Sequence, residues 1–313
     1  MLGKTAGGLF WMSRYLERTE NNARLIEAGM RIALTHSAQA ENEWASIIAT
    51  AGARDAYLAV HDGYDAERVV DFLLRDIRNT SSVYAAMETA RSNARLVRTA
   101  LTREAFEAIN ESWLVLKAAL ARPVSERDLP EVLNLVRQQA ALVRGAVLGT
   151  MLRNEIYNFM RLGTFLERAD NTARILDVKY YVLLPAASFV GSAIDNIQWE
   201  MILRAVSAHR SFRWLTGGDV SAAGIAEFLI LDQRMPRSLA FCCSKIVENF
   251  RHLETEYGVQ TESGQLARTI DARVKNSSIE MIFDGGLHEF LQSFLRDVAG
   301  LGRQIEEDFR FTK

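Results

Sequence analysis

The chain has 313 residues, of which 49% are hydrophobic and 24% are charged, the composition of a globular protein with a sizeable core. Its formal net charge of −2 argues against a nucleic-acid partner, because nucleic-acid-binding domains carry a clustered basic excess. The longest uncharged run, 180 to about 194, contains Pro185 and falls short of the roughly 20 residues of a membrane span. Residues 1–12 lack a signal-peptide pattern, and the adjacent Cys242 and Cys243 are poorly placed for a disulfide. We therefore expect no nucleic-acid or membrane partner and a cytoplasmic location.

Long helical periodicities and only four prolines predict an all-α chain. In the first half, helices are expected at about 7–36, 41–53, 65–76, 82–101, 102–122 and 128–151, with a polar break at 54–63. In the second half, they are expected at about 155–184, 195–215, 221–231, 236–257, 264–275 and 287–309. Glycine pairs at 217–218 and 285–286 mark two of the breaks.

A charged segment of the first helix recurs about 150 residues later. Residues 14–27 read RYLERTENNARLIE, and residues 164–177 read TFLERADNTARILD. The Leu, Glu, Arg, Asn, Ala and Arg residues are identical at matching positions. The segment therefore predicts a repeated helix rather than a chance similarity of composition.

At 100° per residue, each copy places a polar stripe along one side of its helix. The first stripe contains Glu17, Glu20, Asn21 and Arg24, with Arg14 at its edge. The second contains Glu167, Asp170, Asn171 and Arg174. We expect Tyr15, Leu16, Thr19, Ala23 and Ile26 on the core-facing side, and Arg18 and Arg168 between the two faces.

A second pair of segments supports duplication of the whole chain. Residues 72–82 match residues 228–238 at an offset of 156, sharing Phe, Leu, Asp, Arg and Ser. The spacing between the two motifs thus differs by only six residues between halves. We predict a helical bundle built from two homologous helical halves, 1–150 and 151–313, that share one core about a pseudo-two-fold axis.

The stripes allow two interpretations. In one, they are solvated surfaces whose Glu–Arg pairs contribute roughly 0.2–0.5 kcal/mol each. In the other, they form a buried or cleft-lining network. The recurrence of asparagine, a mediocre helix former, as Asn21 and Asn171 favours the second. Whether such a network binds a ligand or only joins two halves stays open.

Arg78 and Arg234 are further candidates for anion binding. Each precedes a serine, Ser82 or Ser238, that is expected to open a helix, and helix N-termini attract anions. Alternatively, the arginines pair with the nearby Asp76 and Asp232, and the serines only cap. The sequence does not separate these two readings.

Metal binding is not expected. The five histidines are scattered and none forms a Glu-x-x-His motif. The arginines of each stripe would also repel a cation. We therefore expect neither a metal nor another cofactor.

The doubled Leu-Glu-Arg-x-Glu/Asp-Asn-x-Ala-Arg segment, residues 90–95 (ARSNAR) and residues 235–238 (MPRS) together resemble the bacterial alpha-E domain family, formerly a domain of unknown function. The resemblance covers essentially the whole chain. That family is named for its helices and its Glu-Arg motif, which is present twice, as Glu17-Arg18 and Glu167-Arg168.

The resemblance implies a functional setting. Genes of this family lie beside, or are fused to, a circularly permuted ATP-grasp ligase and a transglutaminase-like protease, in a proposed system for making and trimming peptides or amides. The resemblance therefore implies an accessory partner that binds the ligase, or its anionic peptide or amino-acid substrate, through the paired stripes. It supplies no catalytic residue.

Two alternatives stay open. The chain could be an enzyme, with Glu17 or Glu167 as the acid or base and Arg18, Arg24, Arg168 or Arg174 clamping an anion. It could also be a purely structural scaffold in which the stripes hold the halves together.

Overall fold

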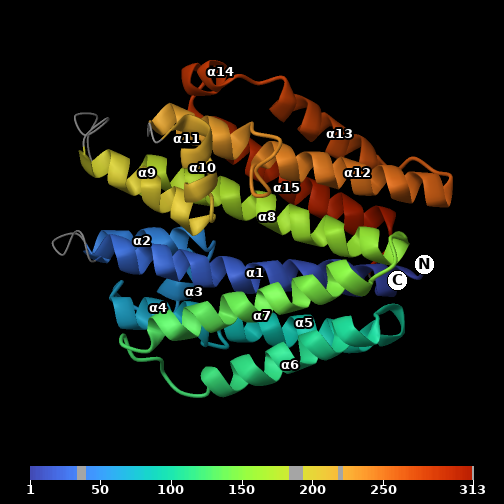
Figure 1. Ribbon diagram of the computed structural model, residues 1–313, viewed down its shortest axis with the longest axis horizontal. Coiled ribbons are helices and arrows are strands. Elements are labelled where there is room, and N and C mark those ends of the chain that lie inside the picture. The colour runs from blue at the N-terminus through green and yellow to red at the C-terminus, as the bar shows by residue number, and fades with distance from the viewer. Residues whose placement is uncertain (34–39, 183–192, 218–220, 312–313) are drawn as a thin grey trace.

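A computed structural model describes residues 1–33, 40–182, 193–217 and 221–311 of the chain (Figure 1). The described residues form fifteen α-helices, one short 3₁₀ turn and no β-strand, which confirms the all-α prediction. In this described part, every helix is too short or too polar to cross a lipid bilayer.

The helices follow one another with short connections. Within residues 1–150 they are α1 (Gly3–Ala33), α2 (Ala40–Thr50), α3 (Arg54–Leu58), α4 (Ala66–Leu74), α5 (Val83–Leu96), the 3₁₀ turn η1 (Arg98–Ala100), α6 (Arg103–Ala119) and α7 (Leu129–Thr150). Within residues 151–313 they are α8 (Glu155–Val182), α9 (Ala193–Ala205), α10 (His209–Thr216), α11 (Ala222–Ile230), α12 (Leu239–Tyr257), α13 (Glu262–Lys275), α14 (Ile279–Asp284) and α15 (Leu287–Asp308).

Several helix starts are fixed by side-chain caps. A short polar side chain precedes the helix and accepts a hydrogen bond from a free backbone N–H of its first turn, which water would otherwise have to satisfy. The capping residues are Asp65, Ser82, Thr102, Ser221, Ser238, Thr261 and Ser278.

The structure differs from the expected element bounds in three places. Helix α3 forms within the expected polar break, because Tyr57 is fully buried and its hydroxyl donates to the carbonyl of Gly63 at 2.7 Å. The helix expected at 195–215 is two helices, separated at Ser207, whose φ of 56° ends α9. Helix α14 was not expected. The expected ends at 34–36 and 183–184 lie outside the described residues.

Helices α1 and α8 lie side by side in the middle of the molecule, and both begin at the end that holds the N-terminus (Figure 1). Helices α5 and α7 pack against α1, and α12 and α15 pack against α8. The two central helices approach closely, because a Cβ added at Gly163 would lie 2.2 Å from the carbonyl oxygen of Phe10. A glycine at this crossing lets the two backbones meet.

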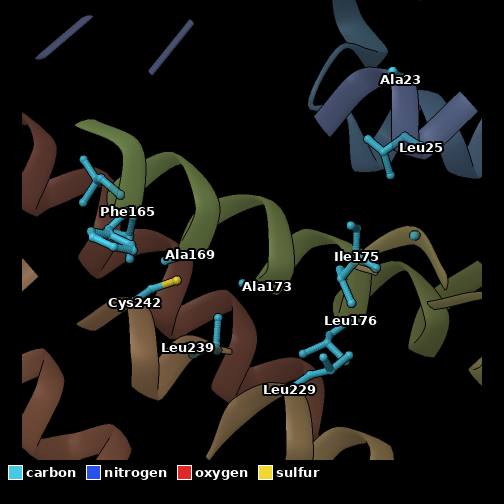
Figure 2. Packing of buried hydrophobic residues seen from close by; sticks show 14 of the residues in the cluster. Ala23, Leu25, Phe165, Ala169, Ala173, Ile175, Leu176, Leu229, Leu239 and Cys242 are labelled. Atoms are coloured by element: carbon cyan, nitrogen blue, oxygen red, sulfur yellow. The ribbon is translucent and has the colours of Figure 1, made fainter. Parts of the chain in front are cut away.

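Small side chains also allow α8 to sit close to α12. Figure 2 shows Ala169 and Ala173 along α8, near Leu239 and Cys242 of α12. All four side chains are buried. Burial raises the pKa of Cys242 to about 12, so this thiol is a protonated core residue.

Corresponding elements occur at matching offsets in the two halves. Helices α4 and α11 begin at 66 and 222, and α5 and α12 begin at 83 and 239, which is an offset of 156 in both cases. Asn22 of α1 donates to the carbonyl of Ser81 at 2.6 Å, and Thr172 of α8 donates to the carbonyl of Arg237 at 2.9 Å. These correspondences agree with the two-half interpretation, which stays a prediction.

Candidate functional site

The two Glu-Arg motifs exchange partners across the α1–α8 contact. Arg168 donates from Nε and Nη2 to the two carboxylate oxygens of Glu17, both at 2.9 Å. Arg18 donates to Glu167 in the same way, at 2.5 and 2.9 Å. Each helix therefore binds the glutamate of the other with a two-pronged, charge-assisted contact.

Both glutamates are buried and held ionised. Glu17 is 4% exposed and Glu167 is 5% exposed. Burial alone would raise their pKa values, but the facing guanidinium groups outweigh it. Arg18 and Arg14 hold the pKa of Glu167 at about 2, and Arg168 and Arg237 hold the pKa of Glu17 far below its usual range.

A second guanidinium completes each pair, and its source differs between the two. Arg14 of α1 donates to Glu167 at 2.9 Å. For Glu17, the second guanidinium comes from Arg237, in the turn before α12, at 3.0 Å. Arg237 also reaches Glu20 at 3.2 Å and the side-chain oxygen of Asn21 at 3.0 Å.

We call the cluster around Glu17 the filled side; it consists of Glu17, Glu20, Arg24, Arg144, Arg168 and Arg237. Glu20, 2% exposed, is contacted by Arg24 at 2.5 Å, by Arg144 and by Arg237. The neighbouring hollow, lined by α1, α7 and α8, has a volume of only about 50 Å³. This side of the network is packed with its own charges.

We call the cluster around Glu167 the open side; it consists of Arg14, Arg18, Glu167, Asp170, Asn171 and Arg174. All six line a cleft of about 340 Å³ between α1, α8 and α15, together with Asn21 and Ser81. Arg174 pairs with Asp170 at 2.7 Å. Ser81 corresponds to Arg237 in the sequence match, and its short side chain only accepts a bond from Arg18 at 3.2 Å. The position that Arg237 fills on one side is therefore vacant on the other.

The structure brings the residues of both predicted stripes together in one network, with Asn21 between the filled and open sides. Tyr15 and Leu16, expected toward the core, are half-buried and pack against the hydrophobic core. Glu17, Glu20 and Asn21 of the polar stripe are buried more deeply. The reason is that α1 is covered by α5, α7 and α8, so its polar stripe also faces protein.

Arg78 and Arg234 lie apart from this network. Their side chains are 57% and 73% exposed, and they pair with Asp76 and Asp232 at 2.5 and 2.8 Å. The adjacent serines cap α5 and α12. The geometry therefore gives these two arginines local contacts.

Sequence reasoning did not single out Arg237 or Arg144 as members of the network. Arg237 belongs to the segment 235–238, which contributes only to the family resemblance, and Arg144 lies on a regular amphipathic helix. One feature of the sequence points to Arg237. It aligns with Ser81 in the matched segments 72–82 and 228–238, so the two copies differ in charge at this position.

The arrangement can bind and position but offers little acid–base chemistry. A general base needs a pKa near the working pH, and the pKa values of Glu17 and Glu167 are lowered away from it. Within the described ranges, no group of three or more His, Cys, Asp or Glu side chains is arranged to hold a metal ion.

Comparison with known proteins gives one family and two relatives. A family model described as a predicted alpha-helical domain with a conserved ER motif matches residues 1–309. Uncharacterized proteins of Mycobacterium bovis and Mycobacterium tuberculosis are each 23% identical over 328 aligned residues, which cover 96% of this chain and 35% of each relative. The chain thus spans about a third of the length of these curated relatives. No solved structure matches.

Proposed function

Because this chain belongs to the Alpha-E family of helical domains, we propose that it is the helical accessory partner of a circularly permuted ATP-grasp ligase in a system that forms peptide or amide bonds. In this role it binds rather than catalyses. The open side presents the binding cleft, and the filled side holds the two halves of the bundle in register.

The observation that carries the proposal is that one network contains both buried, fully paired glutamates and an open polar cleft. Two motif glutamates are locked by arginines, which removes them as acid or base. Yet the same helices leave a cleft of about 340 Å³ beside Glu167, within the size range of small-ligand sites. A rigid network next to an open, polar cleft is suited to recognition.

The length of the relatives supports a joint role. In both mycobacterial proteins, the region similar to this chain occupies 35% of a longer polypeptide. A helical domain that occurs within a longer polypeptide is compatible with a function shared with other domains of that polypeptide. When the helical domain and its partner are separate proteins, the shared function would require that they form a complex.

The test is association with the ligase of the source genome. The tagged chain and the ATP-grasp ligase are coexpressed and purified, and ADP release is measured with and without the chain. We expect copurification and a ligase turnover that depends on the chain. A fully active ligase that ignores its presence would contradict the proposal.

The exchanged Glu–Arg pairs also support the purely structural alternative. Breaking a buried, hydrogen-bonded ion pair costs about 3–5 kcal/mol. The exchanged pairs therefore strongly stabilise the contact between α1 in one half and α8 in the other. If variants that line the cleft change neither ligase association nor turnover, the network serves the fold alone.

A further inference from the structure

Asn21 lines the open cleft and carries a buried hydrogen-bond donor that has no acceptor among the described residues. Arg237 donates to its Oδ1 at 3.0 Å, and because a guanidinium can only donate, this contact fixes the orientation of the amide. The other amide atom, Nδ2, is buried and has no partner among the described residues, although Asn21 is only 2% exposed. Buried polar groups are rarely left unpaired, so this donor calls for an acceptor oxygen from a ligand.

The carboxylates that face the cleft do not oppose an anion. Glu167 is bound by Arg14 and Arg18, and Asp170 is bound by Arg174. Their charges are thus already compensated by the protein. An incoming carboxylate meets the outer N–H groups of these arginines rather than a bare negative field.

A second hollow extends the cleft. It has a volume of about 550 Å³ and shares Thr50, Arg174 and Ala299 with the open cleft. Its own carboxylate, Asp177, is engaged by Gln292 at 2.7 Å and by His288 at 2.6 Å. The two hollows thus adjoin beside α15, between Asn21 of α1 and Asp177 of α8, and we call the pair the groove.

Free positive charge borders this groove. Arg54 and Arg296 line the second hollow and Arg303 lines the first, and all three are exposed. None of them has an acidic partner within the described residues. Glu306 and Asp177 are the carboxylates that line the two hollows without an arginine partner among the described residues. Three arginines against these two carboxylates leave a net positive charge.

We propose that this groove binds a short acidic peptide in an extended conformation, with one carboxylate or carbonyl oxygen on the Nδ2 of Asn21 and further carboxylates on Arg296 and Arg303. A peptide fits better than a single small anion, because the two hollows share three lining residues and the arginines are distributed over both. The assignment rests on the proposed function and deepens it by naming the ligand class.

The first experiment is calorimetric titration of the full chain, without ligase, with a peptide of four glutamates. Peptides of four glutamines and four lysines, and citrate, serve as comparisons. We expect saturable binding of the glutamate peptide, at least about tenfold tighter than each comparison. Equal binding of the glutamine peptide, preference for the lysine peptide, or no saturable binding would each overturn the assignment, and equal binding of citrate would show a simple anion site instead.

The second experiment locates the site with charge reversals on exposed positions. Arg296→Glu combined with Arg303→Glu should weaken the glutamate peptide by at least about tenfold. Arg127→Glu, an exposed arginine of the α6–α7 connection, makes the same kind of change away from the groove and should alter affinity by less than about twofold. Equal losses in both variants would mean non-specific attraction.

Asn21→Asp tests the orphan donor itself. The substitution keeps the shape and the acceptor that Arg237 needs, but it replaces Nδ2 with an oxygen. We expect a folded protein, verified by its circular dichroism spectrum, with peptide affinity lowered by at least about tenfold. Unchanged affinity would remove Asn21 from the site. The titrations contain no ligase, so they separate the two proposals. If the unaltered chain does not bind the glutamate peptide but still copurifies with the ligase, the ligand class is overturned and the proposed function stands.

Discussion

The filled and open sides of the α1–α8 network use nearly the same residues and reach different outcomes. On each side, a buried glutamate binds two arginines and a neighbouring acid pairs with an arginine four residues on. Two arginines make the difference. Arg144 adds a guanidinium at Glu20. Arg237 inserts a guanidinium among Glu17, Glu20 and Asn21, whereas Ser81 leaves the corresponding position open. These long side chains, and above all that of Arg237, separate a packed core from a candidate binding site.

The largest expected effect comes from removing that side chain. Arg237→Met leaves the buried carboxylates of Glu17 and Glu20 short of a partner, so the free energy of unfolding should fall by about 3–5 kcal/mol. Its counterpart Ser81→Ala removes one hydrogen bond and should cost about 0.5–1.5 kcal/mol. Urea unfolding followed by circular dichroism measures both, and equal losses would contradict the distinction between the two sides.

Acid should weaken both sides. The folded pKa of Glu167 is about 2, below its ordinary value of 4.5, so its contribution is complete above pH 4.5 and is lost as the pH falls toward 2. That loss is on the order of 3 kcal/mol. In Glu167→Gln this contribution is absent while those of Glu17 and Glu20 remain, so the free energy of unfolding should fall less steeply across this window. Urea titrations at several pH values between 7 and 2.5 give the comparison, and identical slopes would argue against it.

The helix crossing that brings the two sides together can be tested at Gly163. An added methyl group would collide with the carbonyl of Phe10, so Gly163→Ala should destabilise the protein by about 1–3 kcal/mol despite the higher helix propensity of alanine. Gly149→Ala is the matched control, because no atom lies within 4 Å of its added Cβ. There, alanine should be neutral or stabilise by up to about 1 kcal/mol. Thermal unfolding of the two variants decides the matter, and a neutral Gly163→Ala would contradict the close approach.

The smallest expected effect is the difference in stability loss between substitutions of Arg24 and Arg174, which occupy matching positions in the two motif helices. Arg24 contacts the buried Glu20, and its loss should cost about 1.5–3 kcal/mol. Arg174, with 37% of its side chain exposed, pairs with the partly exposed Asp170, and Arg174→Ala should cost about 0–1 kcal/mol. The same urea measurement applies. A reversed order would mean that the open side, not the filled side, stabilises the fold.

The sequence predicted the helical class and most helix positions because they depend on local periodicity and capping. Helices α4, α5, α11 and α12 begin directly after the polar residues that cap them. Helix α3 could not be found in this way, since Tyr57 owes its burial to residues that come later in the chain. The local sequence pattern does not predict contacts between residues that are far apart in the chain.

Only part of the candidate site was predicted, because some of its contacts join residues that are far apart in the sequence. Repetition of Glu17-Arg18 as Glu167-Arg168 indicated that the stripes have a shared role, and the structure places them in one network. Arg237 was missed because its partner Asn21 lies 216 residues away. The helical wheel also assumed one buried face, whereas α1 has protein on several sides.

The exchange of partners between Glu17-Arg168 and Glu167-Arg18 has a consequence for the chain as a polypeptide. Expressed alone, a fragment ending near residue 150 keeps Glu17 but loses both arginines that neutralise it. The complementary fragment keeps Glu167 but loses Arg14 and Arg18. Neither piece is self-sufficient, yet each carries what the other lacks, so the molecule is a natural candidate for split-protein reconstitution.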